Sequence, residues 1–165
     1  MSKFTIGIVG NRNVGKSSIM RRIVGEYSNK YIPTEQAQSC IVPFHTSEGI
    51  FECNIIDYPG NYYPGNLLDS QADMFIIIID SIEFPSVKVC EFIQCHSPHC
   101  VIGMNKCEIK SENTTEIVRK FNPIKCSSKN NYMMEQLFLT ALQKLTGNCA
   151  LIIEEPCSIL HPVLI

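Results

Sequence analysis

Short apolar runs recur along the chain at intervals that suit buried strands. Met74–Asp80 is almost wholly apolar and rich in β-branched side chains, which is typical of a central strand covered on both faces. Ser47-Glu48-Gly49 separates two other runs and favours a hairpin turn. The pattern predicts six strands, at residues 3–9, 40–46, 50–57, 74–80, 101–104 and 123–126.

Amphipathic segments fill most of the spaces between these strands. Ser17–Val24 places Ile19, Met20 and Ile23 on one side of a helix. Helices are predicted at residues 17–24, 86–93, 116–121 and 131–145. Strands that alternate with helices predict an α/β fold, a six-stranded, mostly parallel sheet with helices on both faces. Without repeats or a linker, residues 1–165 form one domain, with 148–165 as an irregular C-terminal extension.

Two long polar segments, 25–38 and 58–72, have no periodicity and contain prolines and glycines. Loops of this length in a compact domain are usually functional. We therefore expect both loops to take part in the activity of the protein.

Composition narrows the class of protein. A net charge of −2 gives no reason to expect nucleic acid or an anionic membrane as the main partner. No apolar stretch reaches the roughly 20 residues that span a bilayer. The chain starts directly on a strand, so we expect no signal peptide. The nine cysteines are scattered, which favours reduced thiols and an intracellular, cytoplasmic protein.

The segment Gly10–Ser17 (GNRNVGKS) has the spacing of a phosphate-binding loop and lies between a predicted strand and a predicted helix. Backbone N–H groups of such a loop cradle phosphates, helped by the N-terminus of the helix. Lys16 would reach the β- and γ-phosphates, and the Ser17 hydroxyl would bind Mg²⁺. The predicted nucleotide-binding residues here are Asn11, Arg12, Asn13, Val14, Gly15, Lys16, Ser17 and Ser18.

A second motif follows the strand at 101–104. Asn105-Lys106-Cys107-Glu108 resembles the Asn-Lys-x-Asp motif of the Ras superfamily of small GTPases. The resemblance implies that Asn105 bonds guanine, that Lys106 packs along the base and braces the phosphate loop, and that Glu108 accepts hydrogens from the ring N–H and the amine. Because adenine lacks these donors, such a site discriminates strongly between the two bases.

Other segments resemble the remaining motifs of this superfamily, in the same order. In Asp57–Gly60, the resemblance implies that Asp57 holds Mg²⁺ and that the Gly60 N–H senses the γ-phosphate. In Tyr31–Thr34, it implies that Thr34 is a second hydroxyl ligand of Mg²⁺ with a catalytic role, beside Lys16.

The resemblance extends to the base-binding segments. Cys126–Lys129 is similar to the Ser-Ala-Lys motif, which implies that Ser127, Ser128 and Lys129 bind the base and that the Ser128 N–H meets the guanine carbonyl. Tyr27 stands where the superfamily places an aromatic ring against the base.

Within the superfamily the chain most resembles the Ran family. The matching segments are Phe44–Thr46, Asn105–Lys110 and Lys129–Gly147, and the resemblance covers roughly residues 3–150. It implies a GTP/GDP switch with Mg²⁺ and a Ran-like or Rab-like role in transport or trafficking. The nucleus is then an open alternative to the cytoplasm. The expected partners are regulators and effectors that bind a monomer through residues 28–38 and 58–72.

Two departures from the superfamily concern catalysis. Asn61 follows Gly60, where a catalytic glutamine is usual, and its shorter side chain should position the attacking water poorly. Arg12 and Asn13 replace glycines that are frequent in this loop. Arg12 would crowd the γ-phosphate and an incoming arginine finger, although the opposite reading, in which Arg12 stabilises the transition state, stays open.

Other departures concern binding and partners. Glu108 extends the usual aspartate by one methylene, so guanine preference should survive with lower affinity. The second switch is short and holds two prolines and two glycines. We expect no acidic tail and no prenyl anchor, since Cys157 lies eight residues before Ile165.

Three classes of function remain open at this point. The first is a switch enzyme that hydrolyses GTP slowly, at or below about 10⁻⁴ s⁻¹. The second is a hydrolysis-deficient GTP-binding module that acts as a decoy or effector-binding partner. The third, a P-loop kinase or ATPase, is disfavoured because no arginine-bearing lid is evident. The cluster Cys90, Cys95, His96, His99 and Cys100 does not have the spacing of a zinc site.

Overall fold

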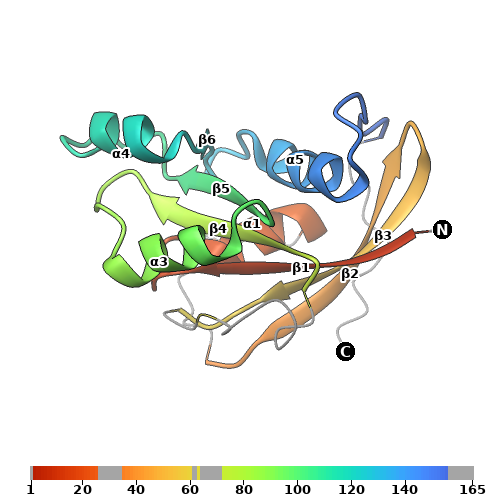
Figure 1. Cartoon of the computed structure of the whole chain (residues 1–165), viewed down its shortest axis with the longest axis horizontal. Coiled ribbons are helices and arrows are strands. Elements are labelled where there is room, and N and C mark those ends of the chain that lie inside the picture. Colours follow the sequence, from red (N-terminus) through yellow and green to blue (C-terminus); the bar gives the residue numbers. More distant parts are fainter. Residues whose placement is uncertain (1, 26–34, 61–62, 64–71, 156–165) are drawn as a thin grey trace.

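The structure is a computed structural model that describes residues 2–25, 35–60, 63 and 72–155 (Figure 1). Strands and helices follow one another nearly as the apolar pattern predicts, with shifts of a few residues at their ends. In chain order they are β1 (Ser2–Gly10), α1 (Lys16–Val24), β2 (Gln38–Thr46), β3 (Gly49–Asp57), β4 (Met74–Asp80), α3 (Val87–His96), β5 (Cys100–Asn105), α4 (Thr114–Phe121), β6 (Ile124–Lys125) and α5 (Met134–Thr146).

The strands form one six-stranded sheet in the order β2-β3-β1-β4-β5-β6. β2 pairs with β3 in antiparallel fashion, and every other pairing is parallel. β1 lies between β3 and β4. After α1 the chain continues on the β3 side of β1, and after β3 it crosses to the β4 side. The predicted α/β class and the mostly parallel sheet are confirmed.

Burial along the strands follows their place in the sheet. All seven residues of β4 are buried, because helices cover both of its faces. β2 and β3 alternate between buried and more exposed positions, with Cys40, Val42 and Phe44 facing inward from β2. Such alternation is expected of an antiparallel hairpin that is covered on one face only.

Two hydrophobic cores lie on opposite faces of the sheet. On one face α1 and α5 pack against the strands, and the ring of Phe138 from α5 stacks on Phe44 at 5.6 Å between centroids. On the other face α3 and α4 contribute Phe92 and Ile117, and Phe92 meets Phe75 of β4 edge-on at 5.0 Å. The predicted helices on both faces are therefore present (Figure 1).

The start of α5 differs from the prediction. We expected a helix from residue 131, but it begins at Met134 because Asn131 and Met133 adopt left-handed backbone conformations, with φ of 53° and 58°. An antiparallel bridge between Ser127 and Tyr132 holds the preceding turn. Residues 131–133 thus belong to the loop after β6 rather than to the helix.

Residues 148–155, which we call the C-terminal strap, lie against the tip of the β2–β3 hairpin (Figure 1). The Ser47 N–H donates to the Ile152 carbonyl at 3.1 Å, and the Glu154 N–H donates to the His45 carbonyl at 2.9 Å. Leu151 is fully buried in the core under α5. Because Pro43 has no N–H to donate, the outer edge of β2 is interrupted just beyond these bonds.

None of the helices in the described ranges has the length and apolarity that crossing a membrane requires. The eight cysteines in the same ranges are all free thiols.

Candidate functional site

The five parallel strands end at one edge of the sheet, and polar residues follow each of them. In open α/β sheets ligands bind at this carboxyl edge, beside the strand where the chain changes direction. That strand is β1, and it leads into the loop Gly10–Gly15 and the first turn of α1. The other groups at this edge are Asp57 after β3, Asp80 after β4, Asn105 and Lys106 after β5, and residues 126–130 after β6.

The β1–α1 loop is held close to the end of β5. Gly15 has φ of +98°, and a Cβ atom there would lie 2.2 Å from Nδ2 of Asn105. Only glycine permits both this backbone conformation and this contact. The loop therefore presses directly on the residue that the sequence predicts to bind the base.

Lys16 lies at the start of α1 and is buried. Its ammonium donates to the Asn11 carbonyl at 2.9 Å, so the side chain folds back over its own loop. Burial lowers the pKa of Lys16, while the nearby Asp57 carboxylate acts in the opposite direction. A buried cation in a loop between a strand and the N-terminus of a helix is suited to a polyanion such as a nucleotide phosphate.

Ser17 and Asp57 lie side by side although they are 40 residues apart in the chain. The Ser17 hydroxyl donates to Oδ2 of Asp57, which is fully buried at the end of β3. A hydroxyl and a carboxylate are hard oxygen donors, the kind that Mg²⁺ takes beside phosphate oxygens and water. The two residues present therefore fit a magnesium site.

Asn105 joins the phosphate loop at Val14 to Ser128, in the segment after β6. Its amide Nδ2 donates to the Val14 carbonyl at 2.9 Å and to Oγ of Ser128 at 3.1 Å. Its Oδ1 accepts the Ser128 N–H at 2.9 Å. The sequence predicted that this N–H would meet a guanine carbonyl, whereas here it bonds to Asn105.

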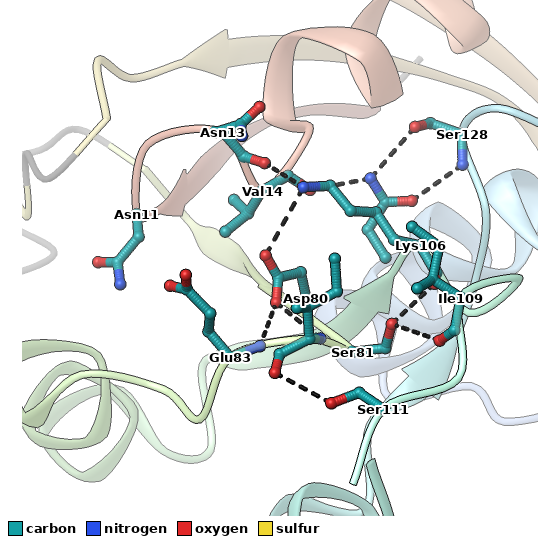
Figure 2. A network of polar contacts seen from close by, with 12 residues as sticks. Asn11, Asn13, Val14, Asp80, Ser81, Glu83, Lys106, Ile109, Ser111 and Ser128 are labelled. Atoms are coloured by element: carbon teal, nitrogen blue, oxygen red, sulfur yellow. Dashed lines mark hydrogen bonds and ion pairs between the residues drawn. The ribbon is translucent and has the colours of Figure 1, made fainter. Parts of the chain in front are cut away.

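Lys106 makes the second link to the phosphate loop. Its ammonium donates to the Asn13 carbonyl at 2.5 Å and lies 3.6 Å from Oδ2 of Asp80 (Figure 2). The other carboxylate oxygen of Asp80 accepts the N–H groups of Ile82 and Glu83, at 2.9 and 2.8 Å. Asp80 thus fixes both the β4–α3 turn and the Lys106 side chain.

The segment that follows β3 also contacts the phosphate loop. A Cβ atom on Gly60 would lie 2.4 Å from Cγ of Arg12 and 2.8 Å from its Cα, so the stem of Arg12 packs on this glycine. The Tyr63 hydroxyl donates to Oδ1 of Asn11 at 2.6 Å. Burial raises the pKa of Tyr63 to about 12.

The remaining predicted residues are spread around this edge. Glu108 lies exposed in a turn beyond Lys106, and Ser18 lies in the first turn of α1. Ser127 Oγ accepts the Asn130 N–H at 3.1 Å and shapes the loop after β6. Four predicted site residues lie outside the described ranges, namely Tyr27, Tyr31, Thr34 and Asn61.

The cysteine and histidine cluster near α3 has a structural explanation. His96 is buried, stacks on Phe92 and bonds to the Phe92 carbonyl through Nδ1 at 2.9 Å. Within the described ranges no three cysteine, histidine or acidic side chains come together as a metal site would require.

Three polar contacts at this edge were missed from the sequence, those of Asp80, Tyr63 and Arg22. Asp80 could have been found, because an acidic residue that ends a buried parallel strand lies at the carboxyl edge. No pattern in the sequence indicates Arg22, whose guanidinium bonds to the carbonyls of Ser128 and Lys129, more than 100 residues away.

A comparison with protein families agrees with this geometry. Residues 5–106, more than half of the chain, match the family described as "50S ribosome-binding GTPase". The matched range includes the phosphate loop, Asp57, Gly60, Asn105 and Lys106. A GTPase domain binds guanine nucleotides and hydrolyses GTP. On this match and this arrangement of residues, the chain belongs to this family of P-loop GTPases.

Proposed function

We propose that the protein is a guanine-nucleotide switch that binds GTP and GDP with Mg²⁺ and hydrolyses GTP slowly. The observation that carries the proposal is the set of hydrogen bonds from Asn105 and Lys106 to the Val14 and Asn13 carbonyls. These bonds make the phosphate loop and the candidate base-binding residues one rigid unit. A nucleotide bound there would contact, at both ends, residues that the protein already holds close together.

At the phosphate end, Lys16 would exchange its bond to the Asn11 carbonyl for one to the β- and γ-phosphates. The loop N–H groups of residues 11–18 would supply the remaining donors. At the base end, Asn105 and Glu108 would read guanine, and Lys106 would lie along the base. Tyr27, Tyr31 and Lys129 complete the proposed contacts.

Ser17 and Asp57, with Thr34 from the first loop, would hold the magnesium ion. When bound, Mg²⁺ neutralises charge on the β- and γ-phosphates and orients them. Ser17 would supply its hydroxyl oxygen to the ion, and the buried Asp57 carboxyl group would hold the ion through water.

The proposal that GTP hydrolysis is slow rests on the residues at two positions, 61 and 12. Asn61 is one methylene shorter than the glutamine that commonly positions the attacking water. Arg12 packs its stem on Gly60, the residue whose N–H would sense the γ-phosphate. This contact favours crowding of the site over a helpful role for Arg12 in the transition state. The same contact is compatible with a second candidate function, a hydrolysis-deficient GTP-binding decoy or effector-binding module.

The proposed setting is Ran-like or Rab-like transport or trafficking inside the cell, in the cytoplasm with the nucleus as the alternative. The protein would act as a monomer. Loops 28–38 and 58–72 would contact the γ-phosphate of GTP and present a surface to regulators and effectors, as switch segments of GTPases do.

Single-turnover hydrolysis of preloaded GTP tests the rate. We expect wild-type turnover at or below about 10⁻⁴ s⁻¹, and a rise of at least about tenfold in Asn61→Gln or in Arg12→Gly. Wild-type turnover far above this range would contradict slow hydrolysis. No turnover above the buffer rate, with or without cell extract, would select the decoy. Equal displacement of labelled GTP by ATP would contradict the roles given to Asn105 and Glu108.

A further inference from the structure

Helix α1 contacts the phosphate loop at one end and the loop after β6 at the other. Its first residues are Lys16 and Ser17, and its last full turn carries Arg21 and Arg22. With a rise of 1.5 Å per residue, Lys16 and Arg22 lie about 9 Å apart along the axis. The helix is therefore a rigid spacer between two parts of the candidate nucleotide site.

Arg22 uses its guanidinium as a fork. Nε donates to the Ser128 carbonyl and one terminal nitrogen donates to the Lys129 carbonyl, both at 2.5 Å. Bonds from a charged donor are stronger than those between neutral groups, and two from one planar group also fix orientation. Residues 128 and 129 are thereby held by their carbonyls on one side.

The other side of the same peptide segment faces Asn105. The Ser128 N–H donates to Oδ1 of Asn105, and the Ser128 hydroxyl accepts from Nδ2. Arg22 thus acts on Asn105 through a single residue, Ser128. Any displacement of the Ser128 peptide would shift the side chain that the proposed function assigns to guanine.

We infer that Arg22 is a positioning residue that sets how long a guanine nucleotide stays bound. It does so by holding the carbonyls of Ser128 and Lys129, so that the Ser128 N–H stays on Oδ1 of Asn105 and keeps that side chain in place. This inference rests on the proposed function, in which Asn105 and residues 127–129 border the base. Arg22 would not touch the nucleotide and would have no part in the chemical step.

Two predictions separate this role from a general effect on folding. Loss of the fork should speed release of GDP, because the base-side contacts loosen. It should leave single-turnover hydrolysis of GTP that is already bound nearly unchanged, because Lys16, Ser17 and Asp57 are anchored elsewhere. A variant that merely destabilised the domain would alter both rates and lower the unfolding temperature.

Arg21 offers a matched control. It carries the same charge on the same turn, and among the described residues only Arg22 donates to the two carbonyls. Arg22→Met and Arg21→Met therefore remove the same charge and leave the same kind of side chain. Arg22→Lys keeps the charge but offers a point donor in place of a fork, so it should recover only part of the effect.

The experiment measures dissociation of fluorescent GDP from the 165-residue chain, chased by excess GDP, together with single-turnover GTP hydrolysis. We expect Arg22→Met to release GDP at least about tenfold faster than wild type, Arg22→Lys to fall between, and Arg21→Met to stay within about twofold.

An Arg22→Met release rate within about twofold of wild type would overturn the inference, and so would an equal rise in Arg21→Met. If Arg22→Met does not fold, Arg22→Lys decides: an unchanged release rate in that variant overturns the inference. Wild-type protein that retains no guanine nucleotide would instead refute the proposed function itself, and the inference with it.

Discussion

At the scale of single residues, both N–H hydrogens of the Asn105 side chain are already bonded inside the protein. A side-chain amide has two N–H hydrogens, and here one goes to the Val14 carbonyl and the other to the Ser128 hydroxyl. A guanine that bonds to this nitrogen must therefore replace one of these acceptors. We expect the Ser128 oxygen, at the longer distance of 3.1 Å, to be the acceptor that guanine replaces.

Ser128→Ala removes this competing acceptor. A single hydrogen bond contributes about 0.5–1.5 kcal/mol net, so we expect the Kd for GDP to fall by about twofold to tenfold. Equilibrium titration with fluorescent GDP measures the change. Ser127→Ala is the control, because the Ser127 hydroxyl bonds to the Asn130 N–H rather than to Asn105. Weaker GDP binding in Ser128→Ala would contradict the competition.

Tyr63 gives a prediction on pH. Burial raises its pKa from 10.0 to about 12, so the neutral phenol that donates to Asn11 is favoured in the folded state. A raised pKa on an acidic group stabilises the fold below pH 10, and this contribution is lost as the pH rises from 10 towards 12. Its loss follows directly from ionisation, because a phenolate cannot donate to Oδ1 of Asn11.

Spectrophotometric titration of the tyrosines can detect this shift. The difference in tyrosinate absorbance between wild type and Tyr63→Phe isolates one phenol, and we expect it to develop near pH 12 rather than near pH 10. A difference that is complete by about pH 10 would mean that the Tyr63 phenol is exposed and does not hold Asn11.

At the scale of elements, the C-terminal strap adds stability without touching the nucleotide site. Leu151 is fully buried, and the Gln143 side chain donates to its carbonyl at 3.0 Å. Ile152, the next residue, is 54% exposed. Alanine substitution at these two positions therefore distinguishes the effect of losing a buried side chain from the effect of any change in the strap.

We expect Leu151→Ala to lower the free energy of unfolding by about 2–5 kcal/mol, the usual range for truncation of a buried leucine. Ile152→Ala should change it by less than about 1 kcal/mol. Urea unfolding measures both, and GDP release should be unchanged in each variant. A small effect at Leu151 would show that the strap does not contribute to the core.

The apolar pattern predicted the elements well because burial decides them. Met74–Asp80 could only be a central strand, since its six consecutive apolar residues need cover on both faces of the sheet. The start of α5 was missed because left-handed residues at 131 and 133 depend on the bridge between Ser127 and Tyr132. A contact of this kind leaves no periodic trace in the sequence.

The same distinction applies to the candidate site. Loop motifs identify Gly15, Lys16 and Asn105, because their chemistry depends on residue type and spacing. The fork from Arg22 to residues 128 and 129 depends on how α1 packs against α5 and the sheet, which the sequence does not encode locally. The bond between Asn105 and Ser128 likewise depends on the pairing of β5 with β6, which the sequence alone does not show.

At the scale of the whole molecule, nucleotide binding should stabilise the complete domain, because the site joins loops after β1, β3 and β5. A ligand at 100 times its Kd adds about 2.7 kcal/mol. In a domain of this size, 1 kcal/mol shifts the unfolding temperature by about 2–4 °C. Saturating GDP with Mg²⁺ should therefore raise this temperature by about 5–10 °C.

ADP at the same concentration is the matched ligand, since it offers the same phosphates on a different base. We expect it to raise the unfolding temperature by less than about 2 °C, and differential scanning calorimetry would report both shifts. Equal shifts with the two nucleotides would mean that the base-side residues do not discriminate. Chelation of Mg²⁺ should reduce the GDP shift if Ser17 and Asp57 hold the ion.

The contact between Gly15 and Asn105 also limits how this protein can diverge. A single added methyl at Gly15 would collide with the amide at 2.2 Å, so one mutation would damage the phosphate loop and the base-side residue together. A smaller residue at 105 could relieve the collision only by giving up the Asn105 hydrogen bonds. Mutations at these two positions therefore cannot rescue each other.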